Sequence, residues 1–129
     1  MTRDQVERFA DQWVRWWNAS DVESVLAHFS DDTVFTSPTA AEVVGTATVR
    51  GKDALRAYWT TALKRVGSVH FTLDRVLWDP AGRELAILYT ARMAGKEKRV
   101  SENFRFDDRD MIVTAEVFHG VAGPMGVIA

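Results

Sequence analysis

The chain has 129 residues, no cysteine and a formal net charge of -2. That length suits one domain, and a chain of this size buries roughly two thirds of the surface that it exposes when unfolded. We therefore expect a single domain over residues 1–129 that needs neither a disulfide nor a structural metal. The lack of cysteine also excludes thiol catalysis, thiolate zinc sites and iron–sulfur clusters.

The charge pattern and hydropathy narrow the range of partners. The near-neutral balance argues against nucleic acid, and the longest basic cluster, KEKR at residues 96–99, is interrupted by an acid. Residues 1–5 are polar, and no apolar run approaches the roughly 20 residues that span a bilayer. We therefore expect a soluble cytoplasmic protein without a nucleic-acid or membrane partner.

Helical spacing of apolar side chains predicts three helices in the first half of the chain. Thr2 and Gln5 have the spacing of a capping box before the first helix, and Ser20 and Glu23 repeat it before the second. The helices are expected over residues 3–18, from Ser20 to the Asp31-Asp32 pair, and from Asp53 to Gly67.

Strands dominate the second half of the chain. A first strand, residues 33–37, precedes a long loop or short hairpin at 38–51. Turn residues then separate four strands, which short connections should make antiparallel neighbours. These strands are expected over residues 69–78, 84–93, 98–106 and 111–119, before an irregular tail at 120–129. Helices followed by strands favour an α+β fold in which the helices close over a curved antiparallel sheet and leave an apolar pocket.

The strand over residues 98–106 carries an unusual acid. Glu102 is the one charge on a face that also holds Val100, Phe104 and Phe106. An ionised carboxylate is costly to bury, so desolvation would raise the pKa of Glu102 and keep it protonated as a hydrogen-bond donor. The structural alternative is a carboxylate that reaches an arginine or a backbone N–H at the rim.

His119 is a second candidate on the neighbouring strand. A tight turn at residues 107–110 predicts Glu102 opposite Ala115 and His119 opposite Lys98. His119 would then lie roughly 13 Å along the sheet from Glu102, so the two side chains would bracket a ligand without touching. The alternative is a histidine with a purely structural hydrogen bond.

Other polar and aromatic residues are less specific. Tyr89 either offers a phenolic donor inside the pocket or reaches solvent. The five tryptophans either line the pocket or fill the core. Neither His28 nor His70 has a second histidine at ligand spacing, and no phosphate-binding glycine loop or nucleophile elbow is present. We therefore expect no metal and no cofactor.

Several short motifs, taken together, resemble a known family. In chain order they are WVRWWNASD (13–21), LAHFSDD (26–32), SP (37–38), GKDALR (51–56), ENFRFD (102–107) and FHG (118–120). Their order and spacing resemble the ketosteroid-isomerase and SnoaL-like branch of the nuclear-transport-factor-two-like superfamily, over nearly the whole chain. The resemblance implies a cone-shaped antiparallel sheet wrapped by three helices, a deep pocket for a small hydrophobic molecule, and homodimers packed through the outer sheet face.

The resemblance also implies roles for particular residues. Ketosteroid isomerases combine an aspartate base with an oxyanion hole made of a tyrosine and a protonated aspartate. Glu102 matches the protonated aspartate, but Trp13 stands at the tyrosine position and Ser37 at the base position. Trp59 matches an aromatic residue that supports the tyrosine, and His119 a pocket-lining position. Since Ser37 cannot act as an unaided base, steroid isomerisation by that mechanism is not expected.

The leading hypothesis is a SnoaL-like enzyme with isomerase, cyclase or dehydratase chemistry on a hydrophobic carbonyl compound. Glu102 would be the general acid or carbonyl donor, with His119 or Glu42 as the base. The expected substrate contacts are Trp13, Trp17, Ser37, Trp59, Tyr89, Phe104 and Val117. One alternative is a non-catalytic binding protein for a small apolar ligand. The other is a dimerisation domain with a vestigial pocket, for which Phe118 and Ile112 on the outer sheet face would serve.

Overall fold

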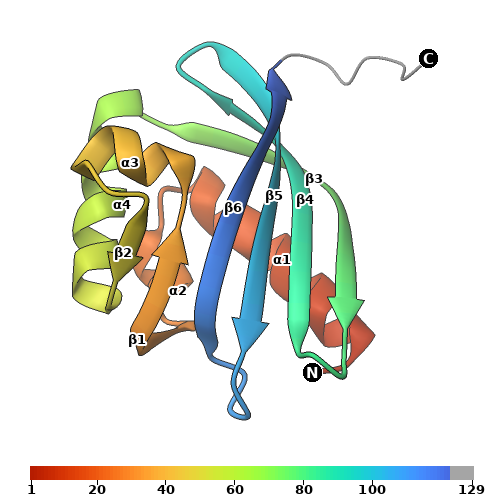
Figure 1. Cartoon of the computed structure of the whole chain (residues 1–129). Coiled ribbons are helices and arrows are strands. Elements are labelled where there is room, and N and C mark those ends of the chain that lie inside the picture. Colours follow the sequence, from red (N-terminus) through yellow and green to blue (C-terminus); the bar gives the residue numbers. More distant parts are fainter. Residues whose placement is uncertain (123–129) are drawn as a thin grey trace.

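A computed structural model describes residues 1–122 of the chain (Figure 1). Within them, four helices and six strands form an α+β fold around one sheet. The elements are α1 (Arg3–Asn18), α2 (Val22–Leu26), β1 (Phe29–Thr36), α3 (Pro38–Val44), β2 (Thr48–Arg50), α4 (Lys52–Val66), β3 (Val69–Asp79), β4 (Glu84–Met93), β5 (Lys96–Phe106) and β6 (Ile112–Ala122).

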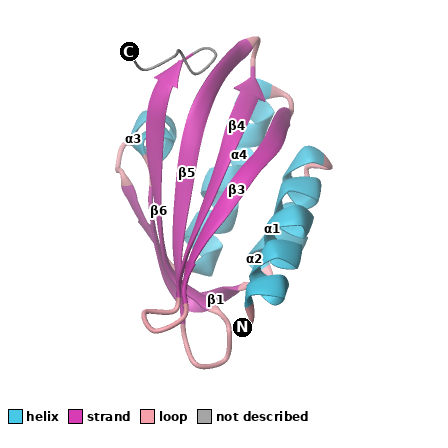
Figure 2. Cartoon of the chain, turned by 90° about the vertical axis from the view of Figure 1, so that its right-hand side faces the viewer, coloured by secondary structure: helices cyan, strands magenta, loops and turns pink. Residues whose placement is uncertain are grey.

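The sheet has the strand order β2-β1-β6-β5-β4-β3. Strands β3 to β6 form an antiparallel meander, as predicted, but β1 runs parallel to β6. In Figure 1, α1 crosses behind the strands, and no described element covers the front face of β4, β5 and β6. Figure 2, turned by 90°, shows α1 and α4 on the same side of the curved sheet. The helices therefore define a concave inner face and leave an outer face.

The start of α2 corrects one sequence prediction. Ser20 does not cap this helix, because its backbone is left-handed with a φ of 57°. Asp21 is the N-cap, and its carboxylate accepts hydrogen bonds from the backbone N–H and the hydroxyl of Ser24. The predicted capping box at the start of α1 is confirmed. The Thr2 hydroxyl accepts from the Gln5 backbone N–H, and the Gln5 side chain accepts from the Thr2 backbone N–H.

Residues 38–51 form a helix and an edge strand instead of the predicted loop or hairpin. The Ser37 hydroxyl accepts from the Thr39 N–H, and Pro38 occupies the first helical position of α3. Gly45 ends α3 in the left-handed conformation. A helix of seven residues is too short to show periodicity, which explains why three helices were expected and four are present among the described residues.

The connection between β5 and β6 is longer than predicted and shifts their register. Glu102 pairs with Val117 instead of the predicted Ala115, and His119 pairs with Val100 instead of the predicted Lys98. His119 still shares a face with Glu102, but lies two residues nearer to it along the sheet. Strand β6 also continues to Ala122, so part of the expected irregular tail is strand, and residues 123–129 lie outside the described residues.

A β-bulge at the start of β6 changes which side chains face outward. The register of β5 and β6 shifts between Arg105 and Phe106, so Ile112 pairs with Phe106. Ile112 is fully buried, and its predicted place on the outer face is wrong. Phe118 lies beyond the bulge and is exposed as predicted, with 54% of its surface accessible.

An aromatic core fills the half of the inner face near this bulge. Trp13 of α1 stacks on Phe71 with ring centroids 5.6 Å apart, and meets Phe104 edge-on. Phe29 packs edge-on against Phe104 and Trp59. Such pairs contribute roughly 0.5–1.5 kcal/mol each beyond the area that they bury. This packing fixes α1 and β1 on the sheet.

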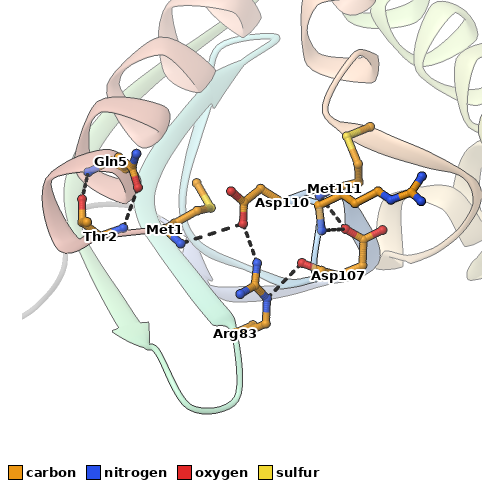
Figure 3. Close-up of polar contacts among 8 residues, drawn as sticks. Met1, Thr2, Gln5, Arg83, Asp107, Asp110 and Met111 are labelled. Carbon is orange, nitrogen blue, oxygen red and sulfur yellow. Dashed lines mark hydrogen bonds and ion pairs between the residues drawn. The ribbon is translucent and has the colours of Figure 1, made fainter.

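A polar network joins the turns at the same end of the sheet (Figure 3). The Arg83 guanidinium donates to the backbone oxygen of Asp107 at 2.9 Å and forms an ion pair with Asp110. The amino group of Met1 lies 3.8 Å from the same Asp110 carboxylate. Asp107 also accepts from the backbone N–H of Met111, which holds the β5–β6 connection in shape.

Asn18, the last residue of α1, connects the helix to an edge strand. Its side-chain amide donates to the Phe71 carbonyl at 3.0 Å and accepts from the Phe71 N–H at 2.6 Å. These bonds satisfy backbone groups of β3 that have no neighbouring strand on that side.

We predict that Asn18→Ala lowers the free energy of unfolding by roughly 1–3 kcal/mol, because two part-buried backbone groups lose their partner. Urea denaturation followed by circular dichroism measures this change. Thr72→Ala, at an exposed position of the same strand, is the control and should change stability little. Equal losses in both variants would contradict the proposed connection.

Candidate functional site

A cavity of about 300 Å³ lies between the inner face of the sheet and helices α3 and α4. It occupies the half of the sheet where β4 ends and β5 begins, and it borders the aromatic core at Trp59 and Phe71. Its walls are mainly apolar, including Leu63, Val66, Phe71, Met93 and Val100. A mainly apolar cavity with a few polar groups is the usual form of a small-molecule site.

Glu102 is a buried acid in this wall. The β5 alternation buries it between Val100 and Phe104, and only 6% of its surface is accessible. The Tyr89 hydroxyl on β4 donates a hydrogen bond to Glu102 Oε1 at 3.2 Å. Burial raises the pKa of Glu102 to about 8, although the bond from Tyr89 opposes this. Glu102 is therefore protonated at neutral pH and offers an O–H donor.

Two tyrosine phenols line the same cavity. Tyr58 projects from α4, and burial raises its pKa to about 12 while the neighbouring Ser37 side chain lowers it. Tyr58 and Glu102 line the same cavity. Burial likewise raises the pKa of Tyr89 well above its ordinary value. Both phenols are thus neutral donors near Glu102.

Charged groups gather at another part of the cavity wall. Lys98 Nζ lies 3.2 Å from His119 Nδ1, and Arg65 and Glu42 also line the cavity. Burial lowers the pKa of His119, and the Lys98 charge lowers it further, while Glu42 acts in the opposite direction. His119 is therefore neutral at neutral pH.

Most of the residues selected from the sequence meet at this cavity. The lining includes Trp17, Ser37, Trp59, Tyr89, Glu102, Val117 and His119. Trp13 and Phe104 are not part of it, because both are buried in the aromatic core. Trp13 instead packs edge-on against Tyr89, with ring centroids 5.1 Å apart, and supports the hydroxyl that bonds Glu102.

Sequence reasoning missed Tyr58 and Lys98. Tyr58 follows Leu55 by three residues on α4, so helical spacing already placed it on the inner side. Lys98 shares the strand face of Val100 and Glu102, but its place in a basic cluster masked that alternation. Within residues 1–122, no group of three or more metal-ligating side chains comes together.

Comparisons with known proteins identify the family. The SnoaL-like domain family matches residues 10–119, and the chain belongs to this family. A comparison with curated protein sequences finds no match. None of the helices within the described part of the chain combines the length and the apolar character needed to cross a membrane.

Solved structures show the same fold. A SnoaL-like protein of unknown function from Burkholderia thailandensis is 28% identical, with a TM-score of 0.81 over 93% of this chain and 98% of that one. A computationally designed 17-OHP binder is 22% identical, with a TM-score of 0.68 over 91% and 95%. The epoxide hydrolase/cyclase-like enzyme SalBIII, from pyran ring formation in salinomycin, is 18% identical, with a TM-score of 0.68 over 93% and 95%.

The raised pKa of Glu102 predicts a stability that falls with pH. Below about 4.5, Glu102 is protonated in both states; between 4.5 and about 8, the unfolded chain releases a proton that the native state keeps. Stability therefore decreases as pH rises through this window, by up to about 1.4 kcal/mol per pH unit, and levels off above it. Glu102→Gln removes this contribution. The free energy of unfolding of this variant should therefore increase relative to that of wild type between pH 5 and pH 8.

Urea denaturation at several pH values measures this difference. Glu116→Gln is the matched control, because Glu116 is exposed on the neighbouring strand, and its difference from wild type should not follow the same curve. A constant offset between Glu102→Gln and wild type across the window would show that Glu102 is ionised in the folded protein.

Proposed function

We propose that this protein is a cofactor-independent enzyme that performs acid–base chemistry on a small hydrophobic carbonyl compound. The supporting observation is the carboxyl group of Glu102, protonated at neutral pH on the wall of an otherwise apolar cavity. Isomerisation, cyclisation and dehydration all pass through a stage at which a carbonyl oxygen gains negative charge. The proposal includes a cytoplasmic location, with which a chain without cysteine is compatible.

Glu102 acts on the carbonyl oxygen of the substrate. Its O–H donates a hydrogen bond to that oxygen, and the bond strengthens as negative charge develops there. Tyr89 donates to the other side of the carboxyl group and keeps it in place. Trp13, behind Tyr89, prevents the phenol ring from moving away. The apolar wall keeps the local dielectric constant low, which increases the value of this donor.

Glu42 and His119 are the two candidates for the proton acceptor. The Lys98 ammonium can only donate, so while its bond to His119 Nδ1 lasts, that nitrogen is an acceptor and the ring proton is on Nε2. His119 then presents an N–H donor to the cavity. We therefore assign the proton acceptor to the Glu42 carboxylate, and His119 takes this role only if Lys98 moves away.

A non-catalytic binding protein is the second proposal. It is favoured by Ser37, which accepts the Thr39 N–H as the N-cap of α3 and supplies no base where the ketosteroid isomerases have one. The computationally designed 17-OHP binder, which shares this fold, supports this proposal. The two proposals differ in whether a bound carbonyl compound exchanges its acidic protons.

We predict that the protein accelerates hydrogen–deuterium exchange at the α-carbon of 2-tetralone in D₂O. This hydrophobic ketone enolises when its oxygen receives a hydrogen bond and a base removes the α-proton. Glu102→Gln should slow the catalysed exchange by about 100-fold or more, as expected for loss of a general acid. Proton NMR follows the reaction, with Glu116→Gln as the control that retains full activity.

Each outcome distinguishes the proposals. Exchange that Glu42→Gln abolishes and His119→Gln retains supports the assigned base, and the reverse result transfers the role to His119. Binding of 2-tetralone without exchange above the buffer rate contradicts the enzyme and favours the binding protein. Full activity of Glu102→Gln overturns the role of Glu102.

The outer face of the sheet supports a further part of the proposal, a homodimer. Leu77 and Phe118 are exposed there, with 56% and 54% of their surfaces accessible. They border a shallow depression of about 660 Å³ over the outer face. Exposed apolar side chains of this kind gather at protein interfaces, and homodimers through this face are what the family resemblance implies.

Phe118→Lys should convert the dimer to a monomer, because a buried charge without a partner is strongly unfavourable at an interface. Size-exclusion chromatography with light scattering measures the mass. Val44→Lys on α3 is the control, since Val44 is exposed but lies away from this face, and it should remain dimeric. A monomeric wild type would contradict the dimer.

A further inference from the structure

Two cationic side chains line the cavity without a carboxylate partner. Lys98 comes from β5 and Arg65 from α4, and among residues 1–122 neither lies within ion-pair distance of an acid. Glu42 is an acid that lines the same cavity. The chain as a whole is slightly acidic, with a formal net charge of -2, so these cations are not part of a generally basic surface.

His119 adds a donor to the same part of the cavity. Its Nδ1 accepts from Lys98, so its remaining nitrogen carries the proton and points an N–H away from Lys98. Lys98 is half-buried and keeps two further N–H groups available. Lys98 and His119 thus offer donors from two neighbouring strands, and Arg65 of α4 lines the same cavity. Cationic N–H donors of this kind bind anionic groups such as carboxylates.

The distance from this group to Glu102 defines the kind of ligand. Lys98 and Glu102 lie four residues apart on the same face of β5, which is roughly 13 Å between backbone positions. We propose that Lys98, His119 and Arg65 form a carboxylate-binding site, and that the ligand is an elongated keto acid. This inference rests on the proposed function, since it assigns the carbonyl to Glu102 and the acid group to the charged end.

The test compares 6-oxo-6-phenylhexanoate with its methyl ester. Both carry an aryl ketone for the apolar wall and Glu102, and only the first carries a charge for Lys98. We expect the acid to bind wild type about tenfold more tightly than the ester, as measured by isothermal titration calorimetry. This preference should decrease at 0.5 M NaCl, because salt screens the ion pair.

Lys98→Met keeps the apolar stem of the side chain and removes its charge. It should weaken binding of the acid about tenfold and leave the ester unchanged. Lys96→Met is the matched control, because Lys96 is exposed on the same strand and does not line the cavity. His119→Gln retains an N–H donor and should preserve most of the preference, whereas His119→Leu should reduce it.

The outcomes distinguish the carboxylate site from the proposed enzyme function on which it rests. Equal binding of acid and ester by wild type, or an undiminished preference in Lys98→Met, overturns the carboxylate site and leaves the ketone chemistry standing. Binding of neither probe at millimolar concentration contradicts both proposals. Tight binding of the acid that Glu102→Met, which lacks a hydrogen-bond donor, leaves unaffected, but Lys98→Met abolishes, supports the carboxylate site and contradicts the role of Glu102.

Discussion

The central constraint in this protein is one carboxyl group on an apolar sheet face. A fully ionised Glu102 among Val100, Phe104 and the cavity wall would carry a desolvation penalty without a cationic partner. The protein resolves this by keeping the proton and supplying a single phenol, Tyr89, as a neutral partner. Tyr89 in turn depends on Trp13 and on the aromatic core behind it. Packing of the aromatic core thus supports the hydrogen bond that Glu102 receives in the cavity.

The aromatic core and the cavity occupy neighbouring parts of the inner face of the sheet. Strand β5 illustrates this division, since Phe104 and Phe106 belong to the aromatic core while Val100 and Lys98 line the cavity. Glu102 lies at the boundary, where rigid packing meets open space. A donor held there has little freedom to reorient, which is the condition under which a hydrogen bond favours a developing charge.

Alternating strands and capped helices were largely predictable from the sequence, and the details of connections were not. The bounds of α1 follow from Thr2 and from the apolar period, and Glu102 stands out because one charge interrupts an alternating strand. Helix α3 is too short to have a detectable period. The β5–β6 register depends on a bulge next to Ile112, which no local pattern encodes. Tyr58 and Lys98 were missed although helical spacing placed the first on the inner side and strand alternation placed the second on the face of Glu102.

The position of β6 between β1 and β5 has a consequence for how the chain is made. Before residues 112–122 leave the ribosome, the sheet exists as two unconnected pieces, β1 with β2 and β3 with β4 and β5. Each piece then exposes a strand edge that pairs only with β6. Residues 112–122 must therefore leave the ribosome before the sheet can close, which gives chaperones an interval in which to act on the nascent chain.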